Sequence, residues 1–129
     1  MTGVNGVSAV LVGNDYPATT AVLEPQPADS TPTSGIYSFG SDVDANFLTP
    51  NQVGTLNLSS ANLSGTESLS NPIAPFLVQN QAVSSSFSIG STGSGTFWGN
   101  PAVSTGSVIY FLDERGGANG HPAIVSVTK

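Results

Sequence analysis

The stretch Val83-Ser84-Ser85-Ser86-Phe87-Ser88-Ile89 decides the fold class of this chain. Apolar residues occupy three of its four odd-numbered positions, and serine occupies every even-numbered one. Alternation with a period of two is typical of a strand that is buried on one face only. Residues 35–40 alternate in the same way, with Tyr37 and Phe39 on one face and Ile36 and Ser38 on the other. The sequence therefore predicts β-structure.

Further short runs of β-branched, aromatic and leucine residues lie on both sides of this stretch. Gly or Pro interrupts almost every window in which apolar residues follow helical spacing, so we expect very little helix. The remaining predicted strands are residues 7–12, 19–24, 53–58, 63–69, 96–98, 108–112 and 123–128. Of these, residues 108–112 form the most apolar run. Residues 26–34 and 41–50 are expected to be loops, the first of them also suiting an internal linker.

Eight or nine short strands in chain order favour an all-β fold, a single up-and-down β-barrel. Closure removes exposed strand edges, which this chain has few charges to protect. A two-sheet β-sandwich is the alternative. If closure occurs within one chain, residues 7–12 must pair with another strand of the same molecule, and we expect residues 123–128 to be that partner. Alternatively, residues 7–12 complete the sheet of a neighbouring copy by strand addition.

The composition bounds the function. The chain has 129 residues, enough for a single domain, and only 8% of them are charged against a usual share of about 25%. Its basic residues are Arg115 and Lys129, and the formal net charge is −6. Nucleic-acid binding is therefore not expected, because it needs a basic surface. Membrane insertion is not expected either, because no apolar run reaches helix-spanning length.

A low lysine content combined with many Ser, Thr and Gly residues favours an extracellular or cell-surface location. Cysteine is absent, which excludes disulfides and thiolate metal sites.

Several short strings resemble a known family. They are Leu23-Glu24-Pro25-Gln26, residues 34–40 (SGIYSFG), Gly65-Thr66-Glu67, Gly95-Thr96 and residues 108–112 (VIYFL). Together they resemble the repeated β-rich modules of long exported proteins from soil Acidobacteria. Ser68 stands where that family carries an acid, and residues 93–96 lack its arginine. The resemblance implies an exported repeat architecture and transfers no catalytic residue. Residues 1–129 are then one all-β domain, or one module of a longer repeat protein.

The leading interpretation is a non-catalytic structural or adhesive module. Its partners would be neighbouring copies, held by strand pairing, or a carbohydrate. A carbohydrate or small-ligand binding module is the second interpretation, with Trp98, Asn100 and Tyr37 as the ligand-binding residues. Trp98 follows Phe97 directly, so strand alternation places one of the two outside the barrel. An exposed Trp98 beside Asn100 suits stacking on a sugar ring, and a packed loop anchor is its other interpretation.

A hydrolase is the third interpretation. Its residues would be Asp113, Glu114, Arg115 and His121, which form the densest polar cluster of the chain. Such a loop supplies general acids and bases. As a surface turn, the same loop would face solvent and hold a salt bridge worth about 0–1 kcal/mol.

Metal binding has little support in the sequence. Asp42 and Asp44 supply hard oxygens for calcium, but the twelve-residue calcium-loop pattern is absent. One histidine without cysteine does not make a typical zinc site. No cofactor is expected.

Overall fold

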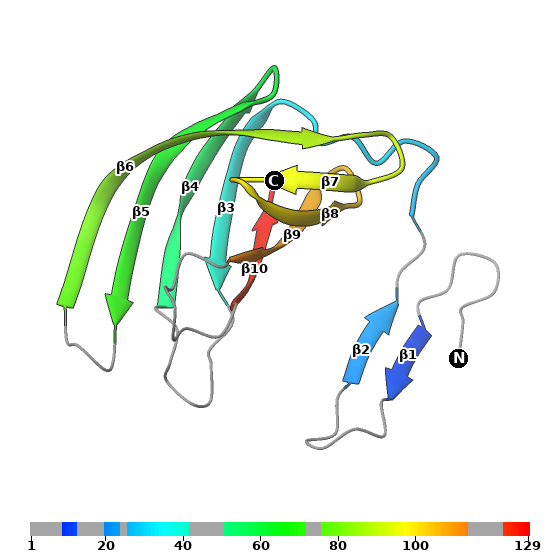
Figure 1. Ribbon diagram of the computed structural model, residues 1–129, viewed down its shortest axis with the longest axis horizontal. Helices are drawn as coiled ribbons and strands as arrows, with labels where there is room; N and C mark the ends of the chain where they lie inside the picture. The colour runs from blue at the N-terminus through cyan, green and yellow to red at the C-terminus, as the bar shows by residue number, and fades with distance from the viewer. Residues whose placement is uncertain (1–8, 13–19, 24–25, 42–50, 72–75, 114–122) are drawn as a thin grey trace.

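The fold was analysed in a computed structural model that describes residues 9–12, 20–23, 26–41, 51–71, 76–113 and 123–129. Every regular element within these ranges is a β-strand (Figure 1). Two strands near the N-terminus are β1 (Ala9–Val12) and β2 (Thr20–Leu23). The others are β3 (Gly35–Ser41), β4 (Asn51–Ser59), β5 (Asn62–Asn71), β6 (Phe76–Ile89), β7 (Ser94–Phe97), β8 (Asn100–Ser104), β9 (Val108–Asp113) and β10 (Ala123–Thr128). No helix in the described part of the chain has the length and apolar character needed to cross a membrane.

Strands β3 to β10 form a closed barrel in which each strand pairs with its neighbours in the sequence. All these pairings are antiparallel, and β10 closes the barrel against β3 with Val127 opposite Phe39. Eight described strands therefore build an up-and-down barrel, as the sequence predicts. The two-sheet sandwich is not the architecture.

The N-terminal strands lie outside this barrel. Within the described ranges β1 and β2 pair with each other, Ala9 opposite Leu23 and Val12 opposite Thr20. The expectation that residues 7–12 pair with residues 123–128 is therefore wrong. Strand β10 has β9 along one edge and β3 along the other, so no edge of β10 is left for a terminal strand.

Alternation along each strand fills the barrel interior. In β9 the inward side chains are buried and the residues between them are exposed or half-buried. The buried core consists of Tyr37, Phe39, Leu56, Leu58, Leu63, Ile89, Phe97, Ala102, Ile109, Phe111, Val125 and Val127. Phe39 lies opposite Gly54 on β4, where a Cβ atom would come within 2.5 Å of the Phe39 ring. That Cβ atom would also collide with the Thr66 backbone carbonyl, so glycine at position 54 makes room for both the ring and the neighbouring strand.

The segment between β2 and β3 covers one end of the barrel, which we call the capped end. The Ser30 N–H donates to the Ser91 carbonyl (2.9 Å), and the Gln26 side-chain amide donates to the Ser104 carbonyl (3.0 Å). Ser30 and Pro32 are buried. The Thr31 hydroxyl, followed by its backbone N–H, lowers the pKa of the exposed Asp29 carboxyl by hydrogen bonding. Residues 26–34 are thus a loop, as expected, but one that packs on the barrel.

Strand β8 is absent from the predicted strands, and its first residues, Asn100 and Pro101, follow Gly99 and show no apolar alternation. It forms because Trp98 and Gly99 make a two-residue hairpin turn with Phe97 opposite Asn100. Both turn residues have positive φ, 55° at Trp98 and 77° at Gly99. This backbone geometry matches the twist of the flanking strands and joins them tightly.

Strand β6 begins seven residues earlier than predicted, at Phe76 instead of residue 83. A register shift in its pairing with β5 lies between Glu67 and Leu69, where Asn80 has a φ of 52°. The bulge shifts the inward and outward alternation by one residue. The alternation of residues 83–89 therefore does not continue into residues 76–80, and the start of the strand was missed.

Candidate functional site

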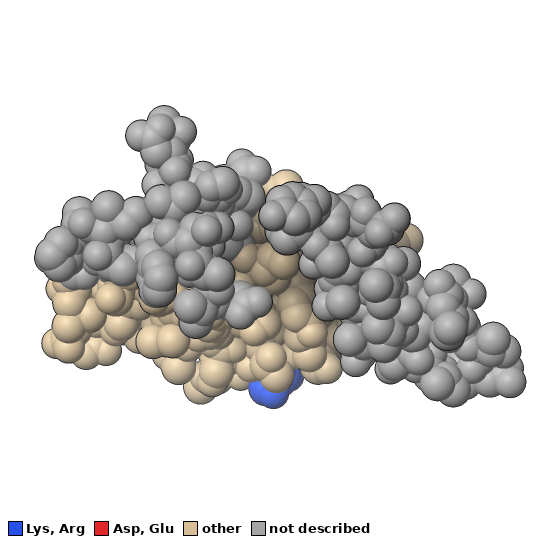
Figure 2. All heavy atoms as spheres, turned by 90° about the horizontal axis from the view of Figure 1, so that it is seen from below, with Lys and Arg blue, Asp and Glu red and all other residues tan. Residues whose placement is uncertain are grey.

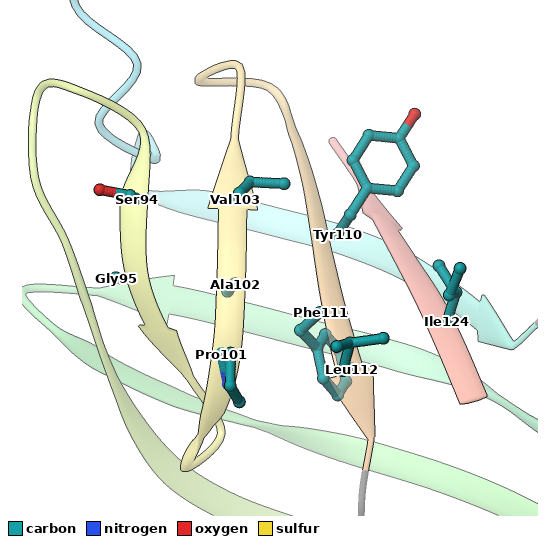
Figure 3. A pocket seen from close by; sticks show the side chains of 9 residues that line it. All are labelled: Ser94, Gly95, Pro101, Ala102, Val103, Tyr110, Phe111, Leu112 and Ile124. Atoms are coloured by element: carbon teal, nitrogen blue, oxygen red, sulfur yellow. The ribbon is translucent and has the colours of Figure 1, made fainter. Parts of the chain in front are cut away.

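An apolar groove of about 380 Å³ runs across the outer wall of the barrel over β7, β8, β9 and β10 (Figure 3). We call it the outer groove. Its lining consists of Ser94, Gly95, Pro101, Ala102, Val103, Tyr110, Phe111, Leu112 and Ile124. Gly95, Ala102 and Pro101 have small side chains or none and leave space for the groove. Larger side chains project around them (Figure 3).

The large side chains of the groove point outward because their strand neighbours point inward. Ile109 and Phe111 are buried in the core, so Tyr110 and Leu112 lie on the opposite face of β9. Tyr110 is 42% exposed and Leu112 40% exposed. Solvent therefore reaches an apolar surface that belongs to the wall and not to the core.

Strand register gathers these residues into one patch. Val103 on β8 lies opposite Tyr110, and Ile124 on β10 lies opposite Leu112. Val103 is 51% exposed and Ile124 is 55% exposed. Contiguous exposed apolar residues commonly mark a contact surface.

A second hollow of about 280 Å³ adjoins the outer groove and shares Tyr110 and Ile124 with it. Its other lining residues are the small Gly40, Ser41 and Ser126. The Tyr110 side chain therefore lies between two depressions, and in Figure 3 its hydroxyl points away from the wall. Together the hollows extend from β7 to β3, the first with an apolar lining and the second with a lining that is partly polar.

The wall formed by β5 and β6 is chemically different. Its exposed residues include Ser64, Thr66, Ser84, Ser86 and Ser88. On the face shown in Figure 2, the described surface carries one small basic area and is otherwise uncharged. The barrel thus has a serine-rich wall, on which Leu77 of β6 is also exposed, and a wall with an apolar groove.

Trp98 packs on the core instead of standing outside the barrel. Its ring meets Phe39 edge-on at a centroid distance of 5.8 Å and lies 6.2 Å from the Phe111 ring. Trp98 does not follow strand alternation, because it is a turn residue with a φ of 55°. The Asn100 side-chain amide donates to the Trp98 carbonyl at 2.9 Å and so supports the turn. Trp98 is a packed turn anchor, and sugar stacking on it stays a prediction.

Tyr37 does not share a site with these two residues. Its side chain is fully buried, and its hydroxyl donates to the Thr33 carbonyl at 2.8 Å near the capped end. Trp98 and Asn100 both lie at the turn between β7 and β8, at the end of the barrel opposite the capped end. The structure therefore keeps Trp98 and Asn100 together and separates Tyr37 from them.

Asp113 closes β9 and is only 7% exposed. Its Oδ2 accepts a hydrogen bond of 2.5 Å from the Gln52 side-chain amide. The expectation that the acids of this turn face solvent is wrong for Asp113, because its position continues the inward series of Ile109 and Phe111. Glu114, Arg115 and His121 lie outside the described residues, so the hydrolase interpretation stays a prediction.

Two buried polar residues were missed in the sequence. Gln52 is 4% exposed and Glu67 is 2% exposed, with the Gln81 amide donating to Glu67 Oε1 at 3.3 Å. In β4, Gln52 alternates in step with the buried Leu56 and Leu58, and in β5 Glu67 alternates in step with the buried Leu63. The sequence pattern therefore indicated that both side chains point inward. They contribute polar groups to the barrel interior at the end opposite the capped end.

Asp42 and Asp44, the calcium candidates, also lie outside the described residues. Among the residues that the structure does describe, no group of three or more His, Cys, Asp and Glu side chains is suited to hold a metal ion.

Comparison of the chain with protein-family models, with curated proteins and with solved structures finds no significant match.

Proposed function

We propose that this chain is a non-catalytic structural or adhesive module of an exported or cell-surface protein, and that it acts through the outer groove. One observation carries the proposal. Large apolar residues are exposed side by side on the outside of β8, β9 and β10, in addition to the buried apolar core inside the barrel. Exposed apolar area on such a small domain favours contact with another surface.

The packing of the interior supports this assignment. Phe97 lies 5.3 Å from Phe111 and 5.9 Å from Phe87, measured between ring centroids. Aromatic pairs at these distances gain from offset or edge contacts. Interiors of eight-stranded barrels are just wide enough for side chains or one small ligand. Since aromatic rings occupy this interior, the outer wall is the better candidate for contacts.

Composition and resemblance support an exported location for the module. The surface is built from Ser, Thr, Asn and Gly with few charges, and short strings of the chain resemble exported repeat modules. Neither observation requires a catalytic group.

The proposal is tested with the double variant Tyr110→Ser/Leu112→Ser on the groove wall. Retention of the protein on an alkyl-coated surface should weaken at least tenfold, because burying either side chain is worth about 1.5–3 kcal/mol. The matched control is Thr66→Ser/Ala82→Ser, which changes two exposed, paired residues on the serine-rich wall. The control should retain wild-type binding. Equal retention by both double variants would contradict the proposal.

A small-ligand binding module is the second candidate, and the volume of the outer groove favours it. Ligand sites measure about 300–1,000 Å³, and the groove measures about 380 Å³. Saturable binding of one soluble apolar probe per chain, lost in the same groove variant, would favour this candidate over adhesion.

A further inference from the structure

Strand β6 has an edge that the described strands only partly cover. On one side it pairs with β5 from Phe76 to Ser86. On the other side it pairs with β7 at Phe87, Ser88 and Ile89. No described strand lies along that second side of residues 76–86, which form the outer margin of the wall in Figure 1. We call this the β6 edge.

The backbone groups of the β6 edge can be assigned from one hydrogen bond. The Ser86 carbonyl accepts from the Trp98 N–H at 3.1 Å, so Ser86 faces the β7 side. Backbone groups of every second residue in a strand point to the same side. The N–H and C=O groups of Ala82 and Ser84 therefore point to the β6 edge, and both residues are exposed.

This edge has few of the features that normally protect a strand from pairing. Strand β6 has 14 residues, none of them charged and none of them proline. Natural edges are guarded by charges, prolines, bulges or short length. The bulge at Asn80 disrupts pairing at the start of the strand, near residues 76–80. Residues 81–86 form a regular, uncharged edge.

The β1–β2 hairpin is a sheet of only two strands. In the described part of the chain its two strands pair only with each other, and an isolated two-stranded hairpin is at best marginally stable. Residues 1–12 contain no charged residue and no proline, whereas β2 is flanked by Pro17, Glu24 and Pro25. Strand β1 is therefore the better suited of the two to add to another sheet.

The two elements lie on different sides of the molecule. In Figure 1 the hairpin stands beyond β7 to β10, and the β6 edge lies at the other extreme of the barrel. We propose that β1 of one copy adds to residues 81–86 of β6 in the next copy. Main-chain hydrogen bonds hold such additions. The formal charge of −6 does not oppose the contact locally, because neither strand is charged.

This contact joins two different surfaces, so it repeats head to tail and produces a chain of copies instead of a closed dimer. The inference rests on the proposed function, since it names a second copy as the partner of the structural module. It uses a different wall of the barrel from the outer groove, and so the two are tested separately.

Two full-length variants test the proposal. Leu11→Pro removes an N–H from β1, and Ser84→Pro removes an N–H that faces the β6 edge and not β5. The controls Leu11→Val and Ser84→Thr keep both groups. In sedimentation velocity, the wild type and the controls should form concentration-dependent oligomers. Each proline variant alone should associate at least about tenfold more weakly, because hydrogen bonds and strand geometry are lost together.

Mixing the two proline variants gives the sharpest result. The Leu11→Pro protein keeps an intact β6 edge and the Ser84→Pro protein keeps an intact β1, so the mixture should form one-to-one pairs and nothing longer. A monomeric wild type, a failure of the mixture to pair, or oligomers lost only in Ser84→Pro would each overturn the proposal. The last outcome would mean that two β6 edges pair with each other.

Two further arms secure the interpretation. If circular dichroism shows that Ser84→Pro is unfolded, Ala82→Lys replaces it, with Ser64→Lys as a control one strand further into the same wall. The groove variant Tyr110→Ser/Leu112→Ser should assemble like the wild type. Loss of surface retention without loss of assembly would then count against the proposed function alone, and the reverse result against this inference alone.

Discussion

Single residues show where alternation is a reliable guide and where it fails. Tyr37, Phe39, Phe87 and Ile89 all point inward, with Phe87 half-buried, as the period of two predicts. Trp98 departs from the pattern because it occupies a turn with positive φ, a conformation that bulky residues seldom adopt. Sequence alone does not reveal this, since the usual two-residue turn carries Asn or Asp before Gly.

The Trp98 turn supports a prediction on stability. Trp98→Asn should improve the local turn conformation but lose the ring contacts with Phe39 and Phe111. Large aromatic truncations cost about 3–5 kcal/mol in full cores, and relief of backbone strain returns about 1–3 kcal/mol. Since the ring is half-buried, we expect a net destabilisation of about 1–2 kcal/mol. Urea unfolding measures it, and an unchanged or higher stability would contradict the anchoring role.

The outer groove illustrates a signal that was present but not used. Residues 108–112 stand out in the sequence as the most apolar run, without a polar face. In a barrel with one filled interior, a strand that is apolar on both faces must expose one of them. Tyr110 and Leu112 were therefore predictable as exposed once the barrel was inferred. Their pairing with Val103 and Ile124 was not, because β8 itself was missed.

At the level of elements, strand existence was easier to predict than strand extent. The central strands were found from their alternation, whereas the first seven residues of β6 were hidden by its bulge. Which strands β1 and β2 pair with depends on the strand edges that remain free once the barrel has closed. This is a long-range property that local sequence patterns do not contain.

Amide hydrogen exchange tests the free edge of β6 residue by residue. The Phe87 N–H donates to the Ala61 carbonyl, so odd-numbered residues of this stretch face β5. Val83 and Ser85 should therefore exchange slowly and Ala82 and Ser84 quickly in dilute, monomeric protein, because backbone hydrogen bonding sets protection. Under assembly conditions Ala82 and Ser84 should become protected. Uniform protection in the monomer would show that another segment already covers the edge.

On the scale of the whole molecule, the closed barrel was predictable, but the two strands that close it were not. Period-two runs, frequent turns and few charges led to an up-and-down barrel, and β3 to β10 form one. The closing pair, Val127 opposite Phe39, joins strands separated by most of the chain. Such a pairing is decided by competition among edges and not by any short stretch of sequence.

The charged loop is the part of the candidate site that sequence reasoning covers least well. Asp113 is buried and bonded to Gln52, which links it to the interior instead of to a surface turn. The sequence spacing already placed Asp113 on the same face of its strand as Phe111. It was nevertheless expected in solvent, because acidic residues are seldom fully buried.

On the proposed function, the module makes its contacts from the outer groove and not from the barrel interior. Backbone amide chemical shifts, followed by NMR during titration with hexanol as an apolar probe, test this most directly. We predict that the shift changes centre on Val103, Tyr110 and Ile124, which line the groove, while Gln52 and Trp98 stay unchanged. Shift changes centred on Gln52 and Trp98, with none at Tyr110, would place the contact site at the end of the barrel interior and contradict the account.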